Sequence, residues 1–180
     1  QNMGRTFILD RSIAHPASLP DIMQKACRYY PAWVENLPKR DPRLVAAEQQ
    51  EHELASRIVV GGSFARQTLI DQGISADRVR INAYGVDWDS FARVKPATSP
   101  VNRPFRFLFV GSVIARKGIP HLLDAWQRLA AKDCELWIVG RVSPTVRKQI
   151  PHLPGLKLWG RTERAVWPDL DAQCDVFVRP

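Results

Sequence analysis

Residues 107–126 (FLFVGSVIARKGIPHLLDAW) constrain the fold of this chain more tightly than any other stretch. The stretch begins with a continuous apolar run at 107–110, stops at Gly111, and passes through a basic loop. Apolar residues then recur at positions 119, 122, 123, 126, 129 and 130. An apolar run followed by a period of 3.6 residues is typical of a strand that leads into an amphipathic helix. We therefore predict that a strand, a loop and a helix follow one another here.

The loop between this strand and helix carries two cations. Arg116 and Lys117 directly precede Gly118 and the predicted start of the helix. Backbone N–H groups in the first turn of a helix lack an intrahelical partner and carry partial positive charge, so two cations beside them favour an anion. We expect the loop to hold a phosphate-bearing ligand, with a solvated basic turn as the alternative. Gly111 would let the backbone approach that ligand closely, unless it only ends the strand.

Composition limits the class of protein and of partner. The 180 residues suffice for one domain or two small ones, and 45% hydrophobic with 24% charged residues is typical of a soluble globular protein. The formal net charge of +8 predicts an anionic partner: a nucleotide, a phosphorylated substrate, a membrane surface or nucleic acid. Because the basic residues are scattered and not interleaved with aromatic ones, we do not expect nucleic acid. The three cysteines form no C-x-x-C motif, which favours buried apolar packing in a reducing compartment.

The first half of the chain alternates apolar runs with helical patterns. We predict strands at 6–9, 57–60 and 78–82, and helices at 21–29, 43–57 and 63–72. Ser63 is the expected N-cap of the third helix. In the 43–57 helix we expect the acidic residues Glu48, Glu51 and Glu53 to face outward and the apolar residues Leu44, Ala47, Leu54 and Ala55 to face inward.

The second half repeats the alternation after a break. Residues 91–103 are rich in proline and lack periodicity, which is typical of a linker. Beyond 107–130 we predict strands at 134–139, 156–159 and 175–178 and helices at 144–150 and 162–173. Alternating strands and helices favour parallel sheets covered by helices on both faces. The predicted fold is therefore α/β, with one Rossmann-like unit at 1–90, a linker at 91–103 and a second unit at 104–180, each incomplete.

Six segments in order resemble one family: RIVVGGSFARQTL, YGVDWDSF, the 107–126 stretch, LWIVG, LWG and DVFVRP. Together they are similar to retaining glycosyltransferases of the GT-B fold, glycosyltransferase family 4 (glycosyl transferases group 1). The most specific part is G-V-D-x-x-x-F at 85–91 followed by G-x-x-x-x-R-K-G at 111–118. The resemblance implies two Rossmann-like domains, with the nucleotide-sugar donor bound chiefly to the C-terminal one and the acceptor largely to the N-terminal one.

The resemblance also implies features that this sequence does not contain. The family has a glycine-rich loop after its first strand and an E-x7-E element beyond the point corresponding to Pro180. We therefore expect the chain to be an internal fragment of such an enzyme and, as given, not to be a competent catalyst.

The resemblance assigns the donor contacts to strand ends and to the basic loop. Arg116 and Lys117 would neutralise the donor diphosphate, where negative charge grows as the sugar leaves. Many relatives have Arg directly after the loop glycine, but here Ser112 occupies that position, so Arg116 would have to supply the charge. The other expected donor contacts are Gly111, Arg141, Arg161 and Thr162.

For three other groups of residues we consider a functional role and, as the alternative, a purely structural one. His15 would act at the acceptor or donor sugar with Arg11 beside it, although a histidine next to proline is often structural. The D-x-D triplet at 87–89 binds a divalent metal in another glycosyltransferase fold, but a turn and helix cap is favoured here. Glu48 and Glu51 lie a turn apart like paired catalytic carboxylates, but an ordinary exposed helix face is favoured.

These observations lead to one expected function and one alternative. We expect transfer of a hexose from a nucleotide-diphosphate sugar to a glycan or lipid-linked acceptor with retention of configuration, in polysaccharide biosynthesis and without a metal or other cofactor. The alternative is a non-catalytic nucleotide- or sugar-binding module. A Rossmann dehydrogenase would need G-x-G-x-x-G after a strand, and the sequence has none. We expect a cytoplasmic protein whose basic surface is able to dock on the anionic inner face of the membrane.

Overall fold

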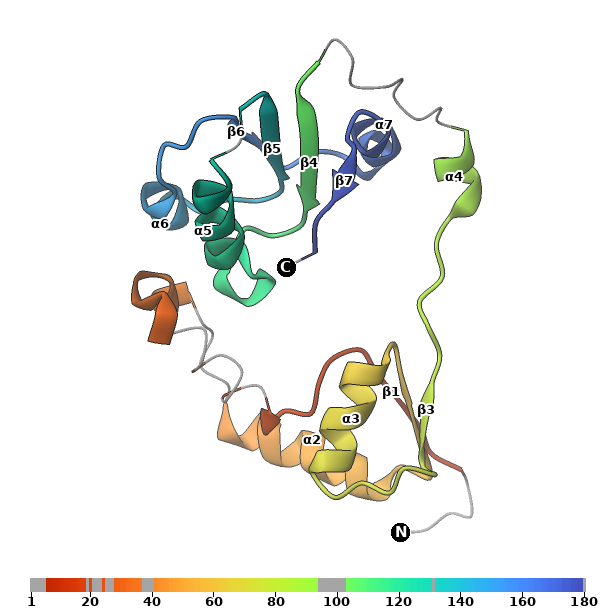
Figure 1. The fold of residues 1–180 in the computed structure, drawn as a ribbon. Helices are drawn as coiled ribbons and strands as arrows, with labels where there is room; N and C mark the ends of the chain where they lie inside the picture. Colours follow the sequence, from red (N-terminus) through yellow and green to blue (C-terminus); the bar gives the residue numbers. More distant parts are fainter. Residues whose placement is uncertain are drawn as a thin grey trace. The chain divides into compact units, whose positions relative to one another are not determined.

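The computed structural model describes residues 6–18, 20, 24, 28–36, 41–93, 103–130 and 132–179, and it divides the chain into two compact units (Figure 1). Unit 1 comprises residues 1–25 and 38–86, and unit 2 comprises residues 26–37 and 87–180. Residues 26–37 therefore group with unit 2, although the sequence places them inside the first predicted domain. Most of the predicted 21–29 helix and of the 91–103 linker lies outside the described residues.

Unit 1 holds a parallel sheet of three strands in the order β1-β2-β3 (Figure 1). The strands are β1 (Ile8–Arg11), β2 (Arg57–Val60) and β3 (Val79–Ile81). Two helices complete the unit: α2 (Pro42–Leu54) precedes β2, and α3 (Ser63–Asp71) lies between β2 and β3 in the sequence. All three predicted strands are confirmed. β1 begins and ends two residues later than predicted, so Arg11 lies in the strand and not beyond it.

The ends of α2 follow ordinary capping rules, whereas the start of α3 does not match the prediction. Asp41 caps α2 by accepting a hydrogen bond from the Arg43 N–H at 2.9 Å, and Pro42 occupies the first helical position. At the other end, the Arg78 guanidinium donates to the carbonyl oxygen of His52 at 2.8 Å. Ser63 is the first residue of α3 and not its N-cap, because Gly62 adopts the extended cap conformation without a side-chain bond.

The predicted orientation of α2 is wrong. Leu44 and Leu54 were expected to face inward, but they are 62% and 74% exposed. Ala47 is exposed as well, and only Ala55, just past the helix, is buried as expected. The helix instead buries His52, at 1% exposure. Its buried face is therefore polar, which an apolar period does not reveal.

Apolar packing in unit 1 lies mainly between the sheet and α3. Its buried members come from β2, β3, α3 and the loops that flank them: Ala55, Ile58, Val60, Leu69, Ile74 and Val79. Leu9 of β1 and Ala65 of α3 pack against this cluster. Burial of aliphatic groups at this scale is the main favourable contribution to the folding of such a unit.

Unit 2 holds a four-stranded parallel sheet in the order β6-β5-β4-β7. The strands are β4 (Phe105–Val110), β5 (Cys134–Val139), β6 (Leu156–Gly160) and β7 (Val176–Phe177). The helices are α4 (Trp88–Ala92), α5 (Ile119–Leu129), α6 (Pro144–Gln149) and α7 (Trp167–Ala172), with short 3-10 turns η3 (Ala115–Lys117) and η4 (Arg164–Val166). The parallel sheet with intervening helices confirms the predicted α/β fold.

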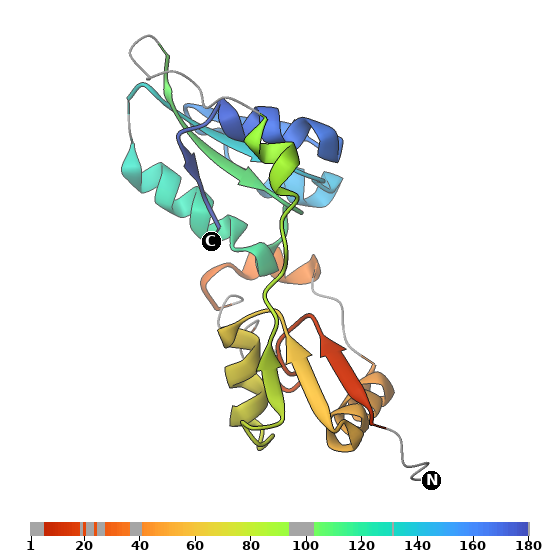
Figure 2. The same cartoon turned by 90° about the vertical axis from the view of Figure 1, so that its right-hand side faces the viewer.

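Helices cover both faces of this sheet. Successive side chains of a strand point to opposite faces, so the apolar strands present two apolar faces that must be covered. Figure 2 shows α5 and α7 on the two faces. On the α7 face, buried residues of β4 and β5 pack with α7: Leu108, Trp137, Val139 and Leu170. On the α5 face, the main core contains Phe109, Leu136 and Ile138 from the strands and Ile119, Leu122, Leu123 and Trp126 from α5. The predicted apolar face of α5 is buried over these four residues, and only Leu129 and Ala130 at its end are exposed.

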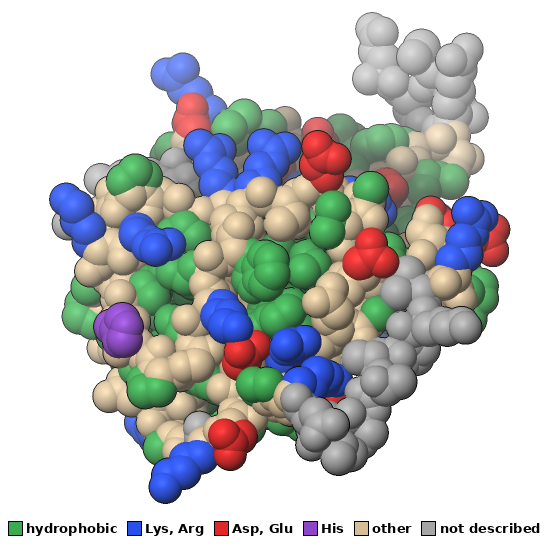
Figure 3. Space-filling model, turned by 90° about the horizontal axis from the view of Figure 1, so that it is seen from above, with side chains coloured by type: hydrophobic (Ala, Val, Ile, Leu, Met, Phe, Trp, Pro, Cys, Tyr) green, Lys and Arg blue, Asp and Glu red, His purple; other side chains and the backbone are tan. Residues whose placement is uncertain are grey.

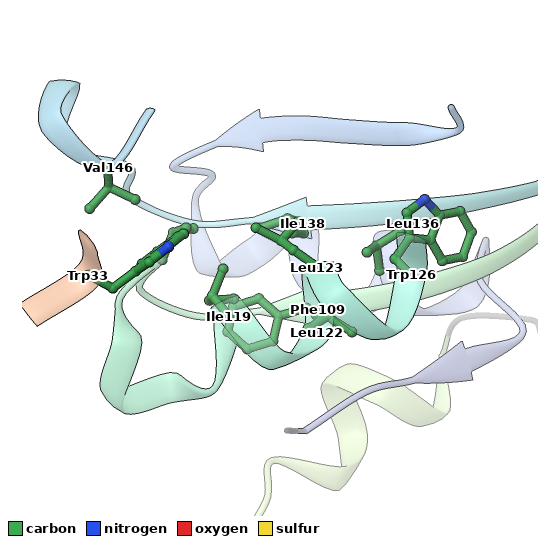
Figure 4. Packing of buried hydrophobic residues seen from close by; sticks show 10 residues of the cluster. Trp33, Phe109, Ile119, Leu122, Leu123, Trp126, Leu136, Ile138 and Val146 are labelled. Carbon is green, nitrogen blue, oxygen red and sulfur yellow. The ribbon is translucent and has the colours of Figure 1, made fainter. Parts of the chain in front are cut away.

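A segment from the N-terminal half of the sequence completes this core. Residues 31–36 form a 3-10 helix, η1 (Pro31–Asn36), and Trp33 is 6% exposed within the α5-face cluster. In Figure 4 the Trp33 ring reaches toward Val146 of α6 and lies beside Ile119. No sequence pattern predicted this packing, because a single aromatic residue in a proline-rich stretch has no period.

The surface shows no gathering of one sign of charge on the face that Figure 3 displays. Lys and Arg side chains are dispersed there, with Asp and Glu side chains between them. Within the described ranges, no helix combines the length and the apolar composition needed to cross a bilayer.

Candidate functional site

Three strands of unit 2 end in glycine at one edge of the sheet. Gly111 follows β4, Gly140 follows β5, and Gly160 ends β6. Backbone hydrogen bonds join these ends: the Gly111 N–H donates to Val139 O at 2.9 Å, and the Gly140 N–H donates to Gly160 O at 2.7 Å. The carboxyl ends of parallel strands are where open α/β sheets bind ligands.

All three glycines adopt backbone conformations that favour glycine. Gly111 and Gly140 have φ values of 156° and 157°, at the border of the region that L-residues avoid, and Gly160 has a φ of 71°, inside it. A Cβ atom on Gly140 would overlap the carbonyl oxygen of Gly111. The close approach of the β4 and β5 ends therefore depends on the absence of a side chain at Gly140.

A cavity of about 720 Å³ opens at these strand ends. Its walls come from the ends of β4 and β5 and from the segment between β6 and α7: Val110, Gly111, Ser112, Val139, Gly140, Arg141, Arg161, Thr162, Glu163, Arg164 and Trp167. The size lies in the range of small-molecule sites. Four predicted donor contacts, Gly111, Arg141, Arg161 and Thr162, line this one cavity.

The cavity also contains residues that the sequence did not single out. Glu163 and Arg164 directly follow the predicted pair 161–162, and they could have been found from that position alone. Trp167 begins α7, and its indole N–H donates to the Thr162 hydroxyl at 3.2 Å. This hydrogen bond fixes an aromatic ring and a hydroxyl group side by side in the wall. Three arginines, one carboxylate and one indole make the cavity predominantly cationic with one apolar wall.

Arg116 and Lys117 lie outside the residues that line this cavity. Both belong to η3 and are exposed, and no ion pair involves either of them in the part of the chain that the structure describes. The turn leads through Gly118, at φ 73°, into the first turn of α5. As predicted, the cations therefore sit between a strand and a helix N-terminus, on the loop that begins at the cavity-lining Ser112.

His15 lies in unit 1 and is buried, at 1% exposure. Its backbone N–H donates to the Thr68 hydroxyl at 3.0 Å, and its Nδ1 accepts from the Ala17 N–H at 3.1 Å. Its ring lies against the ring of His52, with centroids 4.8 Å apart. The Nδ1 acceptor role fixes the neutral tautomer with its proton on Nε2. In this structure the residue predicted to act at the sugar is packed against a helix.

An ion pair accompanies the two histidines. Arg11 at the end of β1 pairs with Glu48 of α2: the distance from Arg11 Nη2 to Glu48 Oε2 is 3.0 Å, and the two side chains are 11% and 21% exposed. Burial lowers the pKa of His15, and burial together with the neighbouring His15 lowers the pKa of His52 to about 4. We call Arg11, His15, Glu48 and His52 the polar cluster. Both histidines in it are neutral at pH 7.

The structural interpretation of the D-x-D triplet is confirmed. Asp87 caps α4, and its carboxylate accepts from the Ser90 N–H at 3.3 Å and from the Ser90 hydroxyl. These hydrogen bonds lower the pKa of Asp87. The carboxylate therefore serves as a helix cap. Glu48, expected on an exposed face, instead pairs with Arg11.

Comparison with known proteins relates this part of the chain to one family. Residues 104–180 match the sequence profile of the family described as Glycosyl transferases group 1. The matched range contains the cavity and η3. Among curated protein sequences, none matches this chain.

Solved structures extend the likeness to both units. A complex of Anabaena HepE with UDP and glucose superposes with a TM-score of 0.65 at 14% identity, over 97% of this chain and 46% of that one. The HepE complex with UDP-glucose gives 0.63 at 16% identity, again over 97% and 46%. The apo lipopolysaccharide outer core galactosyltransferase WaaB gives 0.52 at 18% identity, over 73% and 39%. The chain thus spans less than half of these proteins, and its two units resemble the Rossmann-like halves of a GT-B fold.

Proposed function

We propose that the chain is part of a glycosyltransferase in which unit 2 binds a nucleotide-diphosphate sugar. The observation that carries the proposal is that two independent features fall in the same range, residues 104–180. The range that matches the glycosyltransferase profile also contains the cavity at the strand ends and the basic turn η3. HepE is solved with UDP-glucose, so a UDP-sugar is the first donor to test.

The charges of the two regions suit the two ends of such a donor. Arg116 and Lys117 would neutralise the diphosphate, since Arg offers paired donors to phosphate oxygens and Lys a mobile point charge. Arg141, Arg161 and Thr162 would hold the ribose and the base in the cavity. Because fixed cations stabilise the charge that develops on the leaving phosphate, we propose that donor binding needs no metal ion. Binding in excess EDTA tests this point, and a requirement for Mg²⁺ would contradict it.

We further propose transfer of a hexose to a glycan or lipid-linked acceptor with retention at the anomeric carbon. The net charge of +8 supports an acceptor or a surface that carries negative charge. Anomeric configuration of the product, followed by NMR with the full-length protein, tests retention. An inverted product would contradict the proposed mechanism.

The burial of His15 favours a second candidate, a nucleotide- or sugar-binding module without transfer. At 1% exposure the imidazole does not reach a solvent-facing ligand in this structure. The two candidates differ in turnover: an enzyme releases UDP when UDP-glucose and an acceptor are present, and a binding module does not. His15→Ala separates the roles, because a sugar contact affects turnover whereas a packing role affects stability.

Titration calorimetry with UDP tests the diphosphate assignment. We expect Lys117→Ala to weaken binding about tenfold, which corresponds to about 1.4 kcal/mol. Lys132→Ala is the matched control, because Lys132 is exposed and precedes β5, at the opposite edge of the parallel sheet. Equal affinities of the wild type and Lys117→Ala would refute the phosphate role of the turn.

A further inference from the structure

The segment at residues 30–36, which we call the strap, belongs to unit 2 although it lies far from it in the sequence. Trp33 anchors the strap at 6% exposure, in the same cluster as Val113, Ile119 and Val146 (Figure 4). Figures 1 and 2 both place the orange strap segment beside the start of α5. An aromatic ring buried this far contributes strongly to the position of everything that packs on it.

Polar contacts hold the strap at both sides of this ring. The Gln149 side-chain amide of α6 donates to the Ala32 carbonyl oxygen at 2.6 Å. The Tyr30 ring packs edge-on against His121 with centroids 4.6 Å apart, and its hydroxyl donates to the Asp124 carboxylate at 3.5 Å. Burial and the nearby Asp124 raise the pKa of Tyr30, so the phenol keeps its proton. The strap is therefore fastened to α5 and α6 by specific bonds as well as by apolar packing.

The strap also packs against η3, the turn that carries Arg116 and Lys117. The loop before this turn has an apolar underside, because Val113 is fully buried in the Trp33 cluster and Ala115 packs against it. The Val113 N–H donates to Arg141 O at 3.1 Å, which joins this loop to the cavity wall. The turn thus has a basic outer side and an apolar inner side, and part of the inner cover is the strap.

We propose that the strap positions η3 for anion binding and that Trp33 is a positioning residue for the diphosphate. The turn itself is only three residues long and has no side-chain cap, so its path depends on what lies beneath it. Loss of the Trp33 ring removes that support while both cations remain. A charge-assisted hydrogen bond to a phosphate oxygen forms at about 2.7–2.9 Å, so a displacement of about 1 Å breaks it. This inference rests on the proposed function, because it takes η3 as the diphosphate turn.

A purely structural role for Trp33 makes a different prediction, and the chain offers a matched control. Trp126 belongs to the same core at 7% exposure, but its indole N–H donates to Pro154 O at 2.9 Å, on the segment before β6. Trp126→Ala removes a ring of the same size from the same core without touching the strap. If Trp33 only filled space, the two variants would lose stability and UDP affinity in parallel.

The test compares UDP and uridine binding by calorimetry at 10 °C, with the thermal midpoint of each variant measured alongside. We expect Trp33→Ala to weaken UDP binding about tenfold and leave uridine binding within about twofold, because only UDP carries the diphosphate. We expect Trp126→Ala to keep its UDP affinity despite a similar loss of thermal stability, and Trp33→Phe to recover UDP affinity. Gln149→Ala removes only the bond to the strap, so it serves if Trp33→Ala fails to fold, with an expected loss of about threefold.

The outcomes separate this inference from the function on which it rests. Equal losses in Trp33→Ala and Trp126→Ala, or equal losses for UDP and uridine, would overturn the positioning role and leave diphosphate binding intact. Absence of UDP binding in the wild type would overturn the proposed function and this inference with it.

Discussion

The α2 side of unit 1 and the α5 side of unit 2 are built from different chemistry. On the α5 face of unit 2, buried aliphatic and aromatic side chains pack a helix onto a sheet. In unit 1, the buried face of α2 carries His52 and Glu48, which meet His15 and Arg11 of the polar cluster. Apolar groups gain free energy when they leave water, whereas buried polar groups are costly unless their partners are in place. The α2 side of unit 1 therefore depends on specific partners, whereas the α5 side of unit 2 depends on buried apolar volume.

The difference shows where hydrophobic periodicity can orient a helix. α5 packs on an apolar sheet face, so its apolar stripe is its buried face. α2 packs on polar groups, so its apolar residues Leu44 and Leu54 remain outside. A pattern within one helix contains no information about the surface that it meets. The comparison can be tested by substitutions that are matched between the units.

The largest effect is expected from truncation in the core of unit 2. Ile138→Ala, at a fully buried position of β5, should lower the free energy of unfolding by about 4 kcal/mol through lost burial and a new cavity. All six tryptophans lie in unit 2, so denaturant unfolding followed by tryptophan fluorescence reports on this unit. The control is Leu54→Ala on α2, followed by hydrogen exchange of the α2 and β2 amides because unit 1 contains no tryptophan, and it should change the stability of unit 1 by less than about 0.5 kcal/mol. A large effect of Leu54→Ala would contradict the exposed orientation of α2.

The second largest effect is expected when the pH is lowered and the buried histidine His52 of unit 1 takes up a proton. His52 has a pKa of about 4 when folded and about 6.5 when unfolded, so the unfolded chain binds more protons between these values. The stability of unit 1 should therefore fall as the pH drops from 6.5 to 4, by up to about 3 kcal/mol. Arg11 and Glu48 face the same site, and the lowered pKa of His15 acts in the same direction.

Hydrogen exchange of α2 and β2 amides as a function of pH measures this loss. Tryptophan fluorescence of unit 2 serves as the internal control, because the buried histidines of the described chain both lie in unit 1. His52→Leu should flatten the pH dependence of unit 1. An unchanged slope in that variant would show that other groups cause it.

The smallest effect is expected when one ion pair is removed from each unit and the losses of stability are compared. Arg11→Met removes the ion pair between Arg11 and Glu48 in a largely buried place, which should cost about 2 kcal/mol. Arg128→Met removes an exposed pair with Asp124 within α5, where the side chains are 79% and 41% exposed, and should cost less than about 0.5 kcal/mol. Chemical denaturation of both variants, with hydrogen exchange to resolve unit 1, measures the difference. Equal costs would mean that the polar cluster is better solvated than its burial indicates.

Local signals predicted most of the elements because the residues that set them are adjacent. The strand, glycine and helix at 107–126 follow from spacing alone, and four cavity residues follow from their position after strands. The N-cap at Ser63 and the inward face of α2 were wrong, since a neighbouring glycine and a polar partner surface decided them. The packing of Trp33 was missed because its partners lie about a hundred residues away. The donor-site roles of Arg116, Lys117 and His15 stay predictions.

The strap has a consequence for the order in which the protein is made. Its bond from Gln149 to Ala32 joins residues 117 positions apart. At about 10 residues per second, a ribosome needs roughly 10 s to travel from one to the other. During that time the cluster that buries Trp33 is only partly synthesised. The nascent chain therefore lacks the α6 side of this cluster until residues 144–149 have been made, and a fragment that begins at residue 104 would lack the Trp33 ring altogether.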